Sequence, residues 1–248
     1  MFWTHNDSGG DPAVFAVDST GALLARVRLP GVSNRDWEDI GIGPCEPGGG
    51  PCLFLGDIGD NSERHERIAV YRIPEPDPAT DSVSGPVAIL LATYPDGPRD
   101  AEGLFVTEAG IHIVNKGRSD AIDLFRLPPP YDTSTTVSLE RVQRLAPPPT
   151  SVSAQVTAAA VDPTGQRAAI RTYSSIRFFA VEADTLRPLD GQAGMVAPSQ
   201  LQGEGLDFIS PDLVILTSEA QASRPASLVI LSCDPLRAPP DTLSDSGG

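Results

Sequence analysis

The chain has few of the features that mark helical, membrane-spanning or zinc-binding proteins. Its apolar residues alternate or gather in short runs, so the spacing typical of amphipathic helices is nearly absent. No apolar run approaches the ~20 residues of a membrane span, and no signal-peptide pattern opens the chain. The three cysteines and three histidines show no zinc-ligand spacing. What remains is the pattern of a β-rich globular protein.

Basic residues are also scarce. Eighteen Lys and Arg stand against 33 Asp and Glu, which gives a formal net charge of −15. This balance argues against binding to nucleic acid or to an anionic membrane surface, since both need a basic footprint. We expect a monomer whose partner is a small anionic substrate or a protein or glycan ligand, and the acid excess suits a cation site.

Two of the cysteines have a possible structural use. Cys45 and Cys52 flank the loop Glu-Pro-Gly-Gly-Gly-Pro, so they either close it as a disulfide or remain two thiols at its base. Cys233 follows an apolar run and is expected to be a small buried residue.

A tetrad recurs at intervals of about fifty residues, which is the signature of a repeat architecture. Each copy opens a short apolar strand, and two further strands follow it, with 23 glycines and 25 prolines lying mostly between the strands. The copies are Trp37-Glu38-Asp39-Ile40, Ala101-Glu102-Gly103-Leu104, Val156-Thr157-Ala158-Ala159 and Gly203-Glu204-Gly205-Leu206.

Four antiparallel strands in each repeat predict an all-β fold, a β-propeller of about five four-stranded blades. The alternative is a β-sandwich with coincidental spacing. We predict one domain over residues 1–235, with units at about 1–34, 35–98, 99–150, 151–200 and 201–235, and a disordered tail over 236–248. The first unit lacks an opening tetrad, so we expect the first blade to lack its inner strand and part of the natural N-terminus to be missing.

In a propeller the first strand of each blade lines the central channel, so the tetrad acids and the ends of the second strands should meet at one mouth. Oxygen-rich side chains there suit a hard cation such as Ca²⁺. The predicted metal ligands are Glu38, Glu102, Glu204, Asp57, Asp7 and Asp60. The predicted substrate-binding residues are Lys116, Arg171 and Asn115, and Glu219 and His5 are predicted to handle protons.

A structural interpretation stands beside this one. Acids at strand ends often accept backbone N–H bonds and stabilise turns, and a ring of glutamates paired with Lys and Arg would need no ligand. The chain has no Gly-x-Ser-x-Gly elbow and no phosphate-cradling glycine loop.

Several segments together resemble a group of bacterial, often actinobacterial, extracytoplasmic propeller proteins of uncharacterised function, which is itself distantly similar to phytase-like and esterase-like propellers. The most specific of them is Gly56-Asp57-Ile58-Gly59-Asp60-Asn61. The others are residues 3–9, 36–41, 71–74, 100–104 and 217–219. The resemblance implies an extracytoplasmic, calcium-dependent phosphoester hydrolase with acids around the channel mouth.

The sequence thus leads to two hypotheses. One is a calcium-supported hydrolase of phosphoesters or related esters at the mouth of the channel. The other is a non-catalytic propeller that binds a protein or glycan partner and has a structural polar centre, because one fold hosts many functions.

Overall fold

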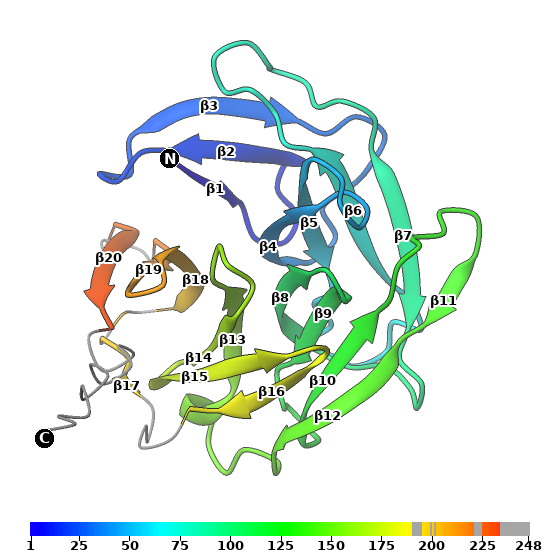
Figure 1. Ribbon diagram of the computed structural model, residues 1–248, viewed down its shortest axis with the longest axis vertical. Coiled ribbons are helices and arrows are strands. Elements are labelled where there is room, and N and C mark those ends of the chain that lie inside the picture. Colours follow the sequence, from blue (N-terminus) through cyan, green and yellow to red (C-terminus); the bar gives the residue numbers. More distant parts are fainter. Residues whose placement is uncertain (190–194, 199, 201, 221–224, 234–248) are drawn as a thin grey trace, which may run out of the picture.

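The protein is a five-bladed β-propeller, as the repeat predicts. The computed structural model describes residues 1–189, 195–198, 200, 202–220 and 225–233, and the strands of these residues form five sheets arranged around a common centre (Figure 1). The proposed tail, 236–248, lies outside the described residues. Within them, no helix has the length and apolar character needed to cross a membrane.

Each sheet runs outward from the centre in chain order. Blade 1 holds β1 (Phe2–His5), β2 (Ala13–Val17) and β3 (Leu23–Arg28). Blade 2 holds β4 (Trp37–Pro44), β5 (Pro51–Asp57), β6 (Ile68–Pro74) and β7 (Ala88–Thr93). Blade 3 holds β8 (Ala101–Thr107), β9 (Gly110–Asn115), β10 (Ile122–Leu127) and β12 (Glu140–Ala146).

The last two blades follow the same order. Blade 4 holds β13 (Val156–Val161), β14 (Arg167–Thr172), β15 (Ser175–Glu182) and β16 (Thr185–Pro188), with the short β17 (Met195–Val196) also paired to β15. Blade 5 holds β18 (Gly203–Ser210), β19 (Leu213–Ser218) and β20 (Ser227–Ser232). A 3₁₀ turn over Val152–Ala154 precedes β13.

The segment before the outer strand of blade 3 pairs with another blade. β11 (Thr136–Ser138) pairs in parallel with β7 of blade 2, and only β12 stays in blade 3. The chain therefore crosses from one blade to the next before returning. Cys45 and Cys52 form the disulfide, with their Cα atoms 4.9 Å apart, and Cys233 is buried.

The core lies between the blades, because each sheet has an apolar face on both sides. Alternate residues of β5 point to opposite faces. Phe54 packs toward blade 3 in one buried cluster, while Leu53 and Leu55 pack toward blade 1 in another. Further clusters fill the blade 3–4 and blade 4–5 interfaces. Neighbouring blades cover each other's apolar faces, so no single blade could retain this core alone.

Asp39 connects three blades from within this core. Its side chain is buried, and its Oδ2 accepts hydrogen bonds from the backbone N–H of Leu104 in β8 (2.8 Å) and of Ala159 in β13 (3.2 Å). A carboxylate from blade 2 thereby satisfies amides of the inner strands of blades 3 and 4.

Replacing Asp39 with Ala should lower the free energy of unfolding by about 2–4 kcal/mol, because two buried amides lose their acceptor. Urea denaturation measures this change. Asp11→Ala, at an exposed acid paired with Arg26, should change stability by no more than about 0.5 kcal/mol. Equal effects of the two substitutions would show that Asp39 does not hold the blades together.

Candidate functional site

Every tetrad coincides with a β-bulge in an inner strand. The pairing of β4 with β5 slips by one residue between Trp37 and Asp39, so Glu38 is the extra residue. The same slip occurs between the first and third residues of the other three tetrads. A bulge bends the strand and redirects the extra side chain. The redirected residues are Glu38, Glu102, Thr157 and Glu204.

Glu38 lies where two groups of acids meet. One carboxylate oxygen each of Asp7, Asp36 and Glu38 lies within 4.8 Å of the other two, and the same holds for Glu38, Asp100 and Glu102. Asp7 follows β1, while Asp36 and Asp100 each stand two residues before a bulged glutamate. Both groups are close enough to hold a metal ion.

Burial and mutual repulsion raise the pKa values of three of these acids, Glu38, Glu102 and Asp36. Loss of hydration raises the pKa of Glu38 to about 11, and the nearby carboxylates of Glu102, Asp36 and Asp7 add to that shift. Burial likewise raises the pKa of Glu102, against the opposing effect of Lys116, and the pKa of Asp36. Without a proton or a cation, the group cannot carry its full negative charge at neutral pH.

Among the described residues, the protein's own cations form ion pairs only with Asp100 and Glu102 of the second group. The Lys116 ammonium contacts the Glu102 carboxylate and lies 3.9 Å from Asp100 Oδ2, and Arg118 Nε lies 2.9 Å from that oxygen. In the described part of the chain, none of the acids of the first group forms an ion pair. We call that group, Asp7, Asp36 and Glu38, the acid triad.

Gly59 closes over the acid triad. A Cβ at this position would overlap Glu38 Oε1 and lie 2.6 Å from Asp36 Oδ2, and the Gly59 N–H bonds the backbone oxygen of Asp36 (3.2 Å). Only glycine lets the backbone approach the carboxylates so closely. The loop over residues 56–61 is therefore part of the site through its backbone.

Two of the predicted metal ligands use their carboxylates to build that loop. Asp57 accepts hydrogen bonds from the Asp36 amide (3.1 Å) and the Tyr71 hydroxyl (3.0 Å). Asp60 accepts from the Ser62 hydroxyl (3.0 Å) and from two amides in its own turn, and its amide donates to Asp100 Oδ1 (2.9 Å). Neither belongs to the two acid groups.

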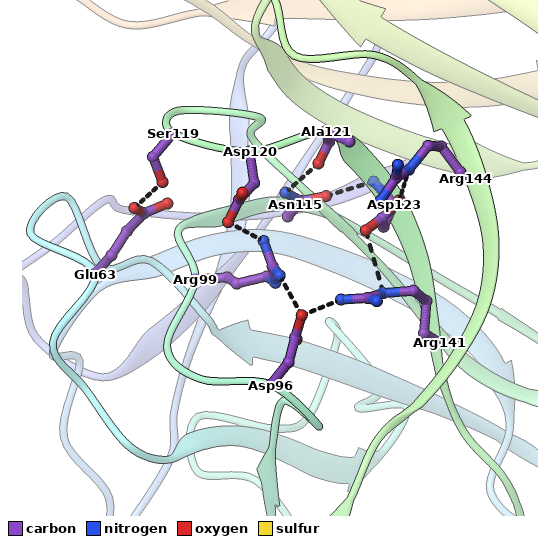
Figure 2. A network of polar contacts seen from close by, with 10 residues as sticks. All are labelled: Glu63, Asp96, Arg99, Asn115, Ser119, Asp120, Ala121, Asp123, Arg141 and Arg144. Carbon is purple, nitrogen blue, oxygen red and sulfur yellow. Dashed lines mark hydrogen bonds and ion pairs between the residues drawn. The ribbon is translucent and has the colours of Figure 1, made fainter.

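Two of the predicted substrate-binding residues, Asn115 and Arg171, make hydrogen bonds that fix a loop and an interface between blades. Asn115 donates to the Ala121 carbonyl (2.9 Å) and accepts from the Asp123 amide (2.6 Å), beside an ion-pair network of Arg99, Arg141 and their acids (Figure 2). It thereby fixes the 115–123 loop.

Arg171 is buried and spans the interface between blades 4 and 5. Its guanidinium donates to the carbonyls of Gly205 (2.7 Å) and Thr217 (2.9 Å) and to Gln200 Oε1 (2.7 Å). Among the described residues, the Nε atom of Arg171 has no hydrogen-bond partner. The bonds to Gly205 and Thr217 connect Arg171 of blade 4 to blade 5.

The remaining predicted residues surround the two acid groups. Glu204 accepts a long hydrogen bond from the Tyr173 hydroxyl (3.4 Å), and burial followed by repulsion from Glu219 raises its pKa. Burial and the negative charge of Asp7 raise the pKa of Glu219. His5 packs edge-on against Trp37, with ring centroids 6.0 Å apart.

Sequence reasoning missed Asp36 and Asp100 as site residues. Both stand in an Asp-x-Glu pattern ahead of an inner strand, Asp36-Trp37-Glu38 and Asp100-Ala101-Glu102. That pattern was the available signal. Thr157, at the bulge of blade 4, has a buried hydroxyl without a hydrogen-bond partner among the described residues. At the other three bulges the redirected residue is a glutamate, whereas Thr157 is uncharged.

The chain matches no protein-family model and no curated protein sequence. It is similar to solved propeller structures at low identity. A gluconolactonase of Xanthomonas campestris is 14% identical, with a TM-score of 0.49 over 90% of this chain and 66% of that one. A 6-phosphogluconolactonase candidate of Bacteroides fragilis is 15% identical, with a TM-score of 0.44 over 93% of this chain and 67% of that one.

A periplasmic gluconolactonase of Pseudomonas aeruginosa is 15% identical, with a TM-score of 0.38 over 89% of this chain and 63% of that one. The chain thus spans about two thirds of the length of each of these structures. At such identities and TM-scores the likeness assigns no substrate. The relation to phytase-like propellers stays a prediction.

The raised pKa values predict that the metal-free protein loses stability as the pH rises from 7 to 9. An acid with a raised pKa in the folded state binds its proton more tightly there than in the unfolded chain, so folding is favoured below the folded pKa and weakened as the pH rises toward it. The loss should be at most about 1.4 kcal/mol per pH unit for each acid. Chemical denaturation at several pH values in chelator measures it.

Glu38→Gln should flatten this pH dependence, because it removes the acid with the most strongly raised pKa of the triad. Glu108→Gln, at an exposed position, is the matched control and should leave the slope unchanged. A slope that is identical in all three proteins would contradict the electrostatic description.

Proposed function

We propose that this propeller binds Ca²⁺ at the acid triad and hydrolyses phosphoesters or related esters of small anionic substrates at the mouth of its channel. The observation that carries the proposal is the acid triad itself: three converging carboxylates, of which Asp36 and Glu38 are half-buried, without an ion pair among the described residues. A divalent cation would relieve the repulsion between these carboxylates, and the partial burial of two of them reduces the screening by solvent.

The donor set fits calcium. All ligands are carboxylate oxygens, which hard cations prefer, and Asp7 and Asp36 come from loops rather than from strand interiors. Thr157 adds an unused hydroxyl at the same level of the inner strands.

The chain's own residues supply the remaining functions. A bound calcium would polarise a phosphoryl or carbonyl oxygen of the substrate. Lys116 and Arg118 are the cations beside the acids, and we assign them to the anionic part of the substrate. Glu219, whose pKa is raised by burial and by the negative charge of Asp7, is assigned to proton transfer, and His5 is the second candidate for that role.

The Cys45–Cys52 disulfide supports an extracytoplasmic location for the protein, since such bonds persist in oxidising compartments.

The second candidate function is a non-catalytic binding module for a protein or glycan. Four of the predicted site residues make hydrogen bonds that stabilise loops or connect blades, as a structural polar centre requires. They are Asp57, Asp60, Asn115 and Arg171. In the acid triad, Asp7 accepts the Ser8 amide, but the carboxylates of Asp36 and Glu38 have no hydrogen-bond partner among the described residues. For that reason we favour the cation-dependent hydrolase.

Calcium should stabilise the protein by about 2.7 kcal/mol at a hundredfold excess over its Kd, which corresponds to a rise in Tm of about 5–10 °C for a chain of this size. Differential scanning calorimetry with calcium and with chelator measures the shift. Glu38→Gln should abolish it and Glu108→Gln should preserve it. A Tm that calcium leaves unchanged would remove the basis of the proposal.

Hydrolysis should depend on Glu219 as well as on calcium. Release of p-nitrophenol from p-nitrophenyl phosphate and from p-nitrophenyl esters, followed in calcium and in chelator, provides the assay. Glu219→Gln should reduce kcat about 100-fold while calcium still raises Tm, because proton transfer is lost and cation binding is kept. If calcium binds but no ester is cleaved, the binding module is the better description.

A further inference from the structure

A cavity of about 340 Å³ lies between blades 3 and 4 and shares no residue with the acid triad. It is bounded by strands of both blades and by the segment that joins β12 to β13. Apolar side chains form most of its wall, chiefly Ile122, Leu145, Ile170, Phe179 and the run Pro147, Pro148 and Pro149. Its size and lining are those of a small-molecule site.

The proline wall of this cavity is held in place at both ends. Gly117 has a φ of +77°, and a Cβ on it would lie 2.9 Å from Pro149, so the proline packs directly on the backbone of blade 3. Further along, the Ser153 carbonyl accepts hydrogen bonds from the Ser174 amide (3.1 Å) and hydroxyl (2.8 Å). Each proline ring also fixes its own φ. The wall is therefore formed before a ligand arrives.

Arg177 is the one charged residue among the described residues that line the cavity. It lies on the same side of β15 as Phe179, because alternate residues of a strand share a face. The carbon at the centre of its guanidinium is 5.7 Å from the centroid of the Phe179 ring. Arg177 forms no ion pair with any described residue, and none of the acids described lines the cavity. The cavity therefore presents one positive charge to an apolar space.

Three hydroxyl groups of the lining are engaged in the turn between β14 and β15. The Thr172 hydroxyl lies 3.0 Å from the Ser175 hydroxyl and accepts a hydrogen bond from the Ser175 amide (3.0 Å). The Ser174 hydroxyl donates to Ser153, as described above. Arg177 is consequently the main polar anchor, and a complementary ligand has an apolar body with a single anionic group.

We propose that this cavity binds a small carboxylic acid with an aromatic or aliphatic body. The carboxylate pairs with Arg177, whose planar guanidinium can donate two parallel hydrogen bonds to the two carboxylate oxygens. The body packs against the proline wall and Phe179, where burial of apolar surface provides affinity. The site depends neither on calcium nor on ester hydrolysis.

NMR titration of the isotope-labelled protein with phenylbutyrate and with octanoate tests this directly. Both acids should shift the amide signals of Arg177 and Ala154, which line the cavity, and should saturate with a Kd of about 1 mM or tighter. Phenylbutanol has the same body without the charge and should bind about tenfold more weakly or worse. Acetate has the charge without the body and should not saturate. Added salt should weaken binding of both acids, because Arg177 is exposed.

A matched pair of arginine variants tests the anchor. Arg177→Gln should weaken binding of both acids by about tenfold or more and leave phenylbutanol unchanged. Arg26→Gln, at an exposed arginine of β3 that pairs with Asp11 outside the cavity, should leave all affinities unchanged.

A second pair of variants tests the location. Ala154→Trp should fill the cavity and remove binding of all probes, whereas Val152→Trp, at a 68% exposed position of the same turn outside the lining, should keep it. Thermal melts of each variant check that it is folded. Four results would overturn the proposal: no saturation by either acid at about 10 mM, equal affinity for phenylbutanol and phenylbutyrate, equal effects of the two arginine variants, or full binding by folded Ala154→Trp.

Discussion

The one-residue bulge at the start of each inner strand is the feature on which the site depends. Without it, the second residue of each tetrad would stay in the ladder and point into an interface between blades, as its neighbours do. The bulge removes Glu38, Glu102 and Glu204 from that alternation and leaves them close enough for their charges to interact. Because the four strands repeat the same irregularity, their redirected side chains converge.

Adjacent acids in the same tetrad consequently have different roles. Asp39 points into the core, where its Oδ2 accepts hydrogen bonds from backbone amides of two neighbouring blades and its Oδ1 accepts one from the amide of Ile40. Glu38, one residue earlier, meets other carboxylates and a glycine backbone instead. Burial raises the pKa of Asp39, and its amide hydrogen bonds oppose that rise while they connect the blades. Glu38 has like charge around it instead, so it needs a cation or a proton.

Much of the architecture could be predicted from the sequence, since the recurring tetrads mark where the inner strands begin. Five blades, the short first blade and the position of most strands follow from the tetrads and the turns. The place of β11 could not be predicted, because pairing with the neighbouring blade depends on where the chain crosses in space. The disulfide remained an open alternative until the two cysteines were seen at the ends of adjacent strands.

The candidate site could be predicted only in part. Glu38, Glu102, Asp7 and Lys116 do meet, because the ends of first and second strands share one mouth. Asp57, Asp60, Asn115 and Arg171 lie near it but are engaged in hydrogen bonds that no sequence pattern reveals. Asp36 and Asp100 were missed because only the bulge brings the redirected glutamates beside them, and a bulge is not visible in the sequence.

The central claim is that a cation replaces protons at an over-charged group of carboxylates. Isothermal titration of the metal-free protein with calcium at pH 7, repeated in buffers of different ionisation enthalpy, tests it most directly. The account predicts saturable binding with the release of about one proton per ion, because acids with raised pKa values must ionise to bind the cation. Binding without proton release, or no binding at millimolar calcium, would contradict it.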